Sequence, residues 1–375
     1  MKRQFYFASR RLSRFSVMDR VKGGMPSRPE PSAFTLLEVM VSIALLSMLL
    51  LLVTGTTNAV SKLWRKAAMQ TASHSEAREA FDSLTTQLSQ LSLQPYWDYV
   101  DSSGRVRSSA NLNSFVPAAI KRQSDLHLIM GPTTEIVAGT GAATHPGHAV
   151  FFQKLGGQDS SLPFSNLVET AGFFVEAVDA PSDPYTPSVV KNALNLTGQK
   201  MRLVEVQALP KETTVYASTN STSAAAQRGW ISDLQVGNPS QRSLKRVAAE
   251  NVILLVLRGR LSEKEDSTGA VLAPNYLYDS RAWVAGTSSI AEKTRNTPPP
   301  IIDVVMVVLE EDSANRLSRA GELTPSAMGY AGLFANAAKL EDDLQQLEDN
   351  LNEKKIGYRV LRASVPVANA RWGEN

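Results

Sequence analysis

The chain contains no cysteine among its 375 residues. Thiol catalysis, disulfide bonds and cysteine-based metal sites are therefore excluded. The sequence motifs of zinc peptidases, phosphate-binding loops, serine hydrolases and dinucleotide-binding folds are absent as well. These absences argue against the common enzyme classes, so we predict that the protein is not an enzyme, and no cofactor is indicated.

Histidine is also scarce, with four residues in the whole chain. His145 and His148 lie close together, but two imidazoles without a third ligand make a weak metal site. Acidic residues cluster at 263–266 and 310–312, without the spacing of an EF-hand calcium loop. Solvated loops or strand ends are the more common explanation of such clusters, so we predict no metal site and no catalytic residue.

Proline is missing between Pro31 and Pro95, which allows one long helix. The run Phe34–Val53 has 20 residues. As a helix it is about 30 Å long, which is enough to cross a bilayer. Further along, apolar residues recur at intervals of four, three, four and three, as in an amphipathic helix: Ala77, Phe81, Leu84, Leu88 and Leu91. We therefore predict a helix over residues 34–93 whose residues 34–53 span a membrane.

Charge is distributed unevenly along the chain. Residues 1–33 hold eight basic and two acidic side chains, whereas the remainder holds 31 basic and 34 acidic residues. The basic excess is confined to this leader, so nucleic-acid binding by the rest of the protein is not predicted. A basic stretch immediately before an apolar span is typical of a cytoplasmic flank. We expect a single-pass protein of the inner membrane, with residues 94–375 in the periplasm or outside the cell.

The apolar run contains a single charged residue, Glu38. A charge near the centre of a membrane helix costs about 2.5–3.5 kcal/mol on insertion scales. An acid at such a position is a functional hypothesis by default. Its carboxylate needs a partner, and the rest of the run offers no opposite charge.

The sequence around Glu38 carries a specific motif. Ala33-Phe34-Thr35-Leu36-Leu37-Glu38, with the following Val39-Met40-Val41-Ser42, closely resembles the cleavage and methylation motif of type IV prepilins and type II secretion pseudopilins. The resemblance implies that a prepilin peptidase cuts between Ala33 and Phe34 and that the new amino terminus of Phe34 is methylated. It also implies that Glu38 aligns the subunit with its neighbour in a filament. One position departs from the family, because Ala33 stands where glycine is usual, and this predicts weaker cleavage.

Two other interpretations of the apolar run stay open. A cleaved secretory signal peptide is disfavoured by the long apolar core, by the acid inside that core and by the long leader. A plain signal anchor explains the length of the run but not Glu38. It would make the protein a membrane-anchored exported enzyme or binding protein, which is the alternative function. A third possibility is a prepilin-type protein whose exported domain binds carbohydrate or another surface.

Beyond Pro95 the sequence changes to short apolar runs separated by loops rich in glycine, serine, threonine and proline. Seven runs are predicted as strands, at residues 126–130, 149–155, 172–178, 201–209, 252–258, 301–309 and 357–365. The run 301–309 is apolar except for Asp303, which predicts a central strand buried on both faces. Residues 335–351 predict an amphipathic helix. The aromatic residues at 95–99 could contact a partner, but such residues more often cover the junction between helix and sheet, which is the expectation here.

This order of elements predicts an α+β fold, and the resemblance implies the pilin-like form, a long N-terminal helix packed on an antiparallel sheet with long loops. We divide the chain into a cleaved leader (1–33), the helix (34–93) and an exported domain (94–375). Stretches at 250–253, 298–307 and 358–372 also resemble the prepilin-type Verru_Chthon cassette protein C family. The predicted function is a minor pilin or pseudopilin, a structural subunit of a type IV pilus or a type II secretion filament. Its predicted partners are the prepilin peptidase and other pilin subunits.

Overall fold

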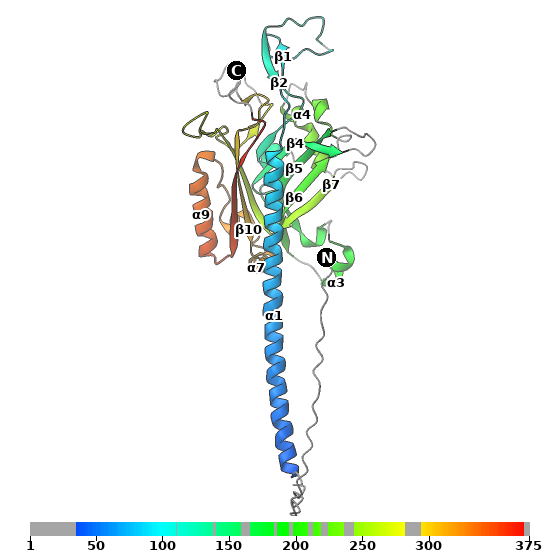
Figure 1. The fold of residues 1–375 in the computed structure, drawn as a ribbon, viewed down its shortest axis with the longest axis vertical. Helices are drawn as coiled ribbons and strands as arrows, with labels where there is room; N and C mark the ends of the chain where they lie inside the picture. Colours follow the sequence, from blue (N-terminus) through cyan, green and yellow to red (C-terminus); the bar gives the residue numbers. More distant parts are fainter. Residues whose placement is uncertain are drawn as a thin grey trace, which may run out of the picture. The chain divides into compact units, whose positions relative to one another are not determined.

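The computed structural model describes residues 35–109, 111–137, 140–158, 166–183, 186–194, 198–208, 213–218, 224–235, 244–281 and 294–370. The chain divides into two compact units, of which the first ends at Leu63 and the second begins at Trp64. The first unit holds the N-terminal part of one long helix. The second unit holds the rest of that helix and every strand in the described part of the chain (Figure 1).

Helix α1 runs without interruption from Leu36 to Ser89. The absence of proline permits this length, and the helix ends at a turn at Gln90. Within the second unit, the apolar stripe that the spacing predicts is buried: Ala77, Phe81, Leu84, Leu88 and Leu91 are at most 6% exposed. The predicted long N-terminal helix is therefore confirmed.

The larger sheet has six antiparallel strands in the order β7–β6–β5–β4–β3–β9. The strands are β3 (Ile129–Pro132), β4 (His148–Gln158), β5 (Asn166–Asp179), β6 (Gln199–Ala208), β7 (Leu244–Glu250) and β9 (Tyr278–Asp279). One close approach on β5 requires glycine. A Cβ atom on Gly172 would lie 2.3 Å from the ring of Phe151 on the neighbouring strand, so a larger residue would have to displace that buried ring.

The smaller sheet has three antiparallel strands in the order β11–β10–β8. They are β8 (Val252–Arg260), β10 (Ile301–Leu309) and β11 (Tyr358–Pro366). Strand β10 lies in the middle, and every residue after Ile301 is buried. The prediction of a central strand at residues 301–309 is confirmed, and Asp303 is buried together with its apolar neighbours.

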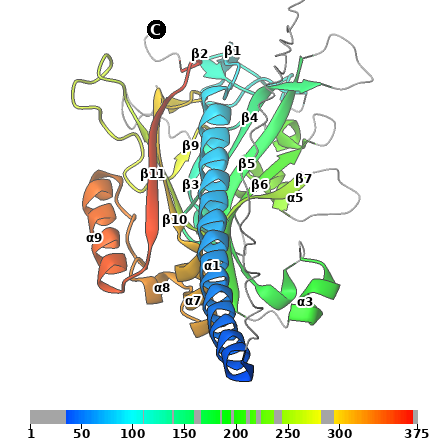
Figure 2. The ribbon, with the colours of Figure 1, turned by 60° about the horizontal axis from the view of Figure 1, so that its bottom comes forward.

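Three hydrophobic cores hold the second unit together. The first lies between α1 and one face of both sheets, and Phe173 belongs to it. The second lies between the smaller sheet and the helices α7 (Glu311–Ala320) and α9 (Leu340–Glu353). The third lies between the larger sheet and α5 (Gly229–Gln235), and it contains Phe174. Neighbouring residues of a strand point to opposite faces, so each sheet serves two cores. Figure 2 shows α1 between β10 and β11 on one side and β4 to β7 on the other.

Shorter elements complete the described part of the chain. A separate two-stranded ribbon is formed by β1 (Tyr96–Val100) and β2 (Ala119–Gln123), which pair antiparallel. The short helices are α2 (Thr133–Ile136), α3 (Ser188–Leu194), α4 (Ala224–Gln227) and α8 (Pro325–Met328), with 3-10 turns η1 (Ala180–Ser182), η2 (Val215–Ser218) and η3 (Ala337–Lys339).

The predicted α+β class, with a long N-terminal helix and antiparallel sheets, is confirmed. All seven predicted strands overlap strands of the structure, and the predicted helix at 335–351 appears as η3 followed by α9. Strands β1, β2, β7 and β9 and helix α7 were not predicted. These elements are short or carry many charged residues, so they lack the apolar periodicity on which the prediction rests.

Candidate functional site

The first turn of α1 is built around Thr35 and Glu38. The backbone N–H of Glu38 donates to the carbonyl oxygen of Thr35 at 3.0 Å and to its Oγ1 at 3.3 Å. A side-chain oxygen that accepts from the third residue of a helix is an N-cap. Thr35 therefore fixes the start of the helix at Leu36 and places Glu38 in the first turn, where the helix dipole favours a negative charge.

The other polar side chains of this apolar stretch bond to their own helix. Ser42 Oγ donates to the carbonyl oxygen of Glu38 at 2.7 Å, and Ser47 Oγ donates to that of Ile43 at 2.8 Å. Between residues 35 and 53, Glu38 is the remaining polar side chain, and its carboxylate has no partner among the described residues. The helix thus satisfies its hydroxyl groups internally and leaves one carboxylate for a partner outside it.

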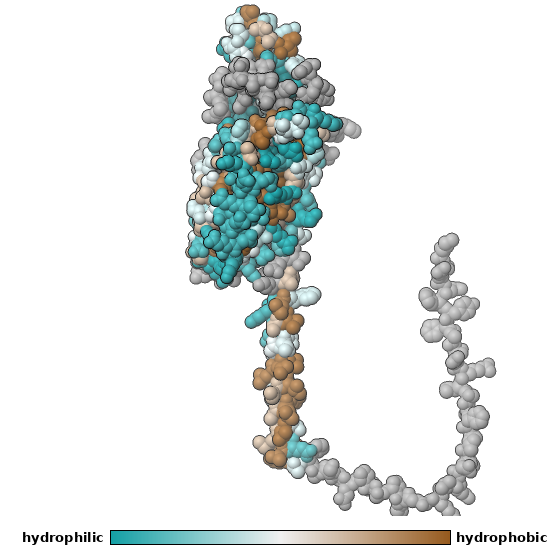
Figure 3. Space-filling model, turned by 90° about the vertical axis from the view of Figure 1, so that its left-hand side faces the viewer, coloured by the Kyte–Doolittle hydropathy of each residue, from teal (hydrophilic) through white to brown (hydrophobic). Residues whose placement is uncertain are grey.

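The surface of this part of the helix is apolar on all sides. Every side chain from Thr35 to Val60 is exposed, and Figure 3 shows the segment as a largely brown, apolar surface. The 30 residues Leu36–Arg65 are long and apolar enough to cross a membrane. An exposed apolar surface of this extent is unfavourable in water, so it requires lipid or other apolar helices around it.

The predicted cleavage site and the predicted assembly residue lie on opposite sides of Thr35, the first residue that the structure describes. Ala33 and Phe34, at the predicted cleavage site, lie outside the described residues. Glu38 lies in the first turn of α1, as described above. The capping role of Thr35 was not predicted. The spacing of Thr35 and Glu38 is that of a capping box, a threonine followed three residues later by a glutamate, and this signal could have identified it.

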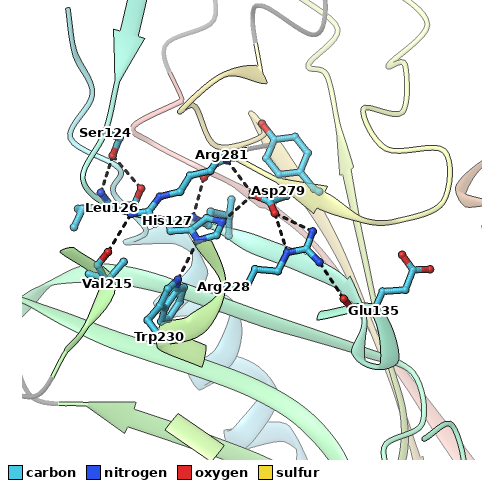
Figure 4. Close-up of polar contacts among 12 residues, drawn as sticks. Ser124, Leu126, His127, Glu135, Val215, Arg228, Trp230, Asp279 and Arg281 are labelled. Carbon is cyan, nitrogen blue, oxygen red and sulfur yellow. Dashed lines mark hydrogen bonds and ion pairs between the residues drawn. The ribbon is translucent and has the colours of Figure 1, made fainter. Parts of the chain in front are cut away.

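A buried polar network in the second unit superficially resembles a catalytic site (Figure 4). His127 Nε2 lies 2.8 Å from Asp279 Oδ1, and Trp230 Nε1 donates to His127 Nδ1 over 3.0 Å. Arg228 donates to the other carboxylate oxygen of Asp279 through Nε at 3.1 Å and Nη2 at 3.0 Å. His127 and Asp279 are 152 residues apart in the sequence, so no local pattern predicts their pairing.

The hydrogen bonds of this network leave neither ring nitrogen of His127 free to act as a general base. The indole group of Trp230 can only donate, so His127 Nδ1 accepts and Nε2 carries the proton toward Asp279. Burial lowers the pKa of His127 against the opposing pull of Asp279. Burial alone would raise the pKa of Asp279, but the hydrogen bonds from His127 and the Arg281 backbone, with the charge of Arg228, bring it to about 2. Since both ring nitrogens are engaged and the ring is fully buried, the network serves to join three segments of the fold.

The two histidines considered as metal ligands serve the fold. His148 is fully buried, its Nδ1 accepts from the backbone N–H of Leu257 at 3.0 Å, and its ring lies 4.6 Å from that of Tyr276. His145 packs instead against Phe174, with ring centroids 5.7 Å apart. Within the described residues, no group of three or more histidine, aspartate or glutamate side chains is placed to hold a metal ion.

The side chains of the two acidic clusters stabilise a turn and the first turn of a helix. Glu265 accepts from the backbone N–H and the hydroxyl of Ser262, and Asp266 accepts from Thr268, so the first cluster closes a turn. In the second cluster, Glu311 lies in the first turn of α7 and accepts from Asn251 Nδ2 at 2.7 Å. Negative charge in the first turn of a helix is favourable.

Asp303 forms a charged cluster on the smaller sheet. Its carboxylate accepts from Arg258 at 2.8 Å, from Arg260 at 3.0 Å and from Ser364 Oγ at 2.7 Å. Burial alone would raise the pKa of Asp303, but these hydrogen bonds and the two guanidinium charges lower it. A surface cavity of about 400 Å³ lies beside the cluster. Asp303 is thus accommodated in a central strand because both neighbouring strands supply donors.

The expectation for the aromatic residues at 95–99 was wrong. They do not cover the junction between helix and sheet. Tyr96, Trp97 and Tyr99 lie on β1, where they are 41%, 60% and 51% exposed. A two-stranded ribbon has no core of its own, so its large side chains stay accessible.

Comparison with known families identifies one segment of the chain. Residues 31–54 match the family model described as the prokaryotic N-terminal methylation motif. This match confirms the prepilin-type signature predicted from the residues around Glu38, and it includes Ala33, Phe34 and the first turn of α1. The narrower resemblance to the Verru_Chthon cassette family stays a prediction. No curated protein matches the chain.

Proposed function

Residues 31–54 carry the prepilin-type methylation motif of type IV pilin-like and pseudopilin-like proteins, and from this premise we propose that the chain is a minor pilin or pseudopilin. In this proposal a prepilin peptidase cuts between Ala33 and Phe34, and the amine of Phe34 is methylated. The subunit then joins a filament of a type IV pilus or a type II secretion system through α1. The matched motif is the observation that carries the proposal.

The unpartnered carboxylate of Glu38 supports this assembly step. Cleavage creates a positively charged amine on Phe34, and a neighbouring subunit shifted along the filament can bring its own amine to Glu38. Opposite charges attract far more strongly in an apolar environment than in water, although their desolvation offsets much of that gain. Glu38 is thus tolerated in the membrane and stabilised by the next subunit on assembly.

The division of the chain follows from the same proposal. Residues 1–33 form a basic cytoplasmic leader that is removed, residues 34–53 span the inner membrane, and residues 94–375 lie outside it. The basic leader and the apolar surface of α1 support this orientation. The exported part then acts as a structural subunit rather than as an enzyme.

Mass spectrometry of the amino terminus tests the processing step. The chain is purified from membranes of cells that contain a prepilin peptidase and from cells that lack it. We expect a terminus of N-methyl-Phe34 in the first case and an intact leader in the second. A terminus near Val60, or an intact leader in both strains, would favour a signal peptide or a plain anchor and contradict the proposal.

Substitution of Glu38 tests the assembly step. Glu38→Gln keeps the size of the side chain and removes its charge. Breaking a buried charge pair typically costs about 3–5 kcal/mol, so we expect the amount recovered in sheared filaments to fall at least about tenfold. Glu79→Gln, at an exposed position of α1, is the matched control and should be incorporated normally. Normal incorporation of Glu38→Gln with N-methyl-Phe34 present would refute the pairing while leaving the processing intact.

A further inference from the structure

The β1–β2 ribbon presents an unusual surface for a part of the protein without a core of its own. Trp97 is 60% exposed, Tyr99 is 51% exposed and Ile120 is 53% exposed. In the ribbon Trp97 pairs with Arg122, and Tyr99 pairs with Ile120. Cross-strand partners share a face, and residues two apart on one strand do as well. These four side chains therefore form one face, which we call the aromatic face.

Part of the aromatic face is held in place before any ligand arrives. The guanidinium group of Arg122 lies 5.5 Å from the centre of the Trp97 ring, within the range of a cation–π contact. Arg122 also donates to the hydroxyl of Thr297, which belongs to a buried segment of the second unit. The ribbon thus orients Trp97 through Arg122 while most of the tryptophan surface stays open. A fixed aromatic ring loses little conformational entropy on binding.

We propose that the aromatic face binds a carbohydrate chain, with sugar rings stacked on Trp97 and Tyr99. The face of an aromatic ring carries partial negative charge, which attracts the C–H groups that line one side of a pyranose ring. The two aromatic residues lie about 7 Å apart along the strand, a separation that lets each meet a ring of one extended sugar chain. The Tyr99 hydroxyl can donate to or accept from a sugar hydroxyl, and Arg122 can donate to one.

The size of the aromatic face favours a sugar chain over a protein partner. The ribbon pairs five residues on each strand, so its face is roughly 17 Å long and 10 Å wide. A stable protein interface involves about 20–30 residues on each partner. Leu112 and Val116, which follow β1 in the chain, are also exposed, but six side chains are still far short of that number. This inference goes beyond the filament role and does not depend on processing or assembly.

Binding of polysaccharides by the full chain in detergent micelles tests the proposal. Insoluble cellulose, chitin and xylan are used in pull-down assays, and soluble xylan, alginate and pectin are used in affinity gel electrophoresis. We expect retention by at least one of these polysaccharides. Trp97→Ala and Tyr99→Ala should each weaken it by about tenfold, as is usual for a central aromatic contact. Leu244→Ala, which removes an exposed apolar side chain from β7, is the matched control and should bind as the unchanged chain does.

Three results would overturn the proposal. The first is that none of the six polysaccharide preparations retains the unchanged chain. The second is that Trp97→Ala and Tyr99→Ala bind as well as Leu244→Ala while circular dichroism shows the same fold. The third is that both substitutions release another protein from the purified chain and leave polysaccharide retention unchanged, which would make the aromatic face a protein contact. Measuring the amino terminus of the same samples keeps these results separate from any failure of the filament proposal.

Discussion

Two stretches of the same helix differ in what surrounds their apolar side chains. From Leu36 to Val53 every side chain is exposed, whereas the apolar stripe from Ala77 to Leu88 is buried against both sheets. The first stretch is apolar all round, and the second only along one side. A helix that is apolar all round needs lipid or other helices, while a helix with an apolar stripe needs a sheet face. The first stretch thus needs lipid or other helices to cover it, whereas the second is covered by the sheets of its own chain.

The strongest test of this difference is to replace one leucine by alanine in each stretch. Leu84 is fully buried in the first core, and replacing a buried leucine by alanine typically costs about 2–5 kcal/mol. We expect Leu84→Ala to lower the free energy of unfolding by about 3–4 kcal/mol, measured by urea titration of the full chain in detergent with tryptophan fluorescence. Leu46→Ala, at a position 61% exposed, should change it by less than about 0.5 kcal/mol. Equal losses in the free energy of unfolding for the two variants would contradict the distinction between a buried and an exposed stretch of the helix.

A second prediction concerns the stability of the second unit in acid. Burial lowers the pKa of His148 to about 4 in the folded chain, against about 6.5 when it is unfolded. The unfolded chain therefore binds this proton more readily, and the contribution of His148 to stability is lost as the pH falls from about 6.5 to about 4. The total loss is about 3 kcal/mol, since one pKa unit corresponds to about 1.4 kcal/mol.

The matched variant for this prediction is His148→Asn, whose side-chain oxygen can still accept from the backbone N–H of Leu257. We expect the free energy of unfolding of this variant to fall less steeply between pH 6.5 and pH 4 than that of the unchanged chain. Other buried groups, including His127, contribute to the common slope, so the difference between the two curves isolates His148. Parallel curves would show that His148 is already free to take up a proton in the folded state.

The parts of the protein that could be predicted from sequence are those in which one signal lies within a short stretch. The run Ile301–Leu309, apolar except for Asp303, predicted a central strand, because a strand buried on both faces is apolar at nearly every position. The motif around Glu38 lies within ten residues, and the first turn of α1 lies inside it. Local sequence therefore revealed the long helix, most strands and the residue expected to serve in assembly.

The features that were not predicted depend on contacts between distant parts of the chain or on the exposure of a side chain. A local sequence pattern contains neither kind of information. His127 and Asp279 pair across 152 residues, and nothing near either residue indicates the other. Trp97 and Tyr99 were expected to cover the junction between helix and sheet, but they lie exposed on a ribbon without a core. Strand β7 was missed because Lys245 and Arg246 on this edge strand interrupt the apolar pattern.

The smallest predicted effect tests how the buried stretch of α1 is held by polar contacts as well as apolar ones. Gln87 Nε2 donates to Glu205 Oε1 at 2.9 Å, and its Oε1 accepts from Lys154 Nζ at 3.0 Å. Glu205 is fully buried and also accepts from Arg246 at 2.7 Å, so its charged partner remains when Gln87 is lost. We therefore expect Gln87→Ala to lower the free energy of unfolding by about 1–2 kcal/mol, in the range of a hydrogen bond to a charged group. The same urea titration checks this value, with Gln90→Ala as an exposed control just after α1. A loss as large as that of Leu84→Ala would mean that polar contacts, rather than the apolar stripe, hold this stretch of α1 on the sheets.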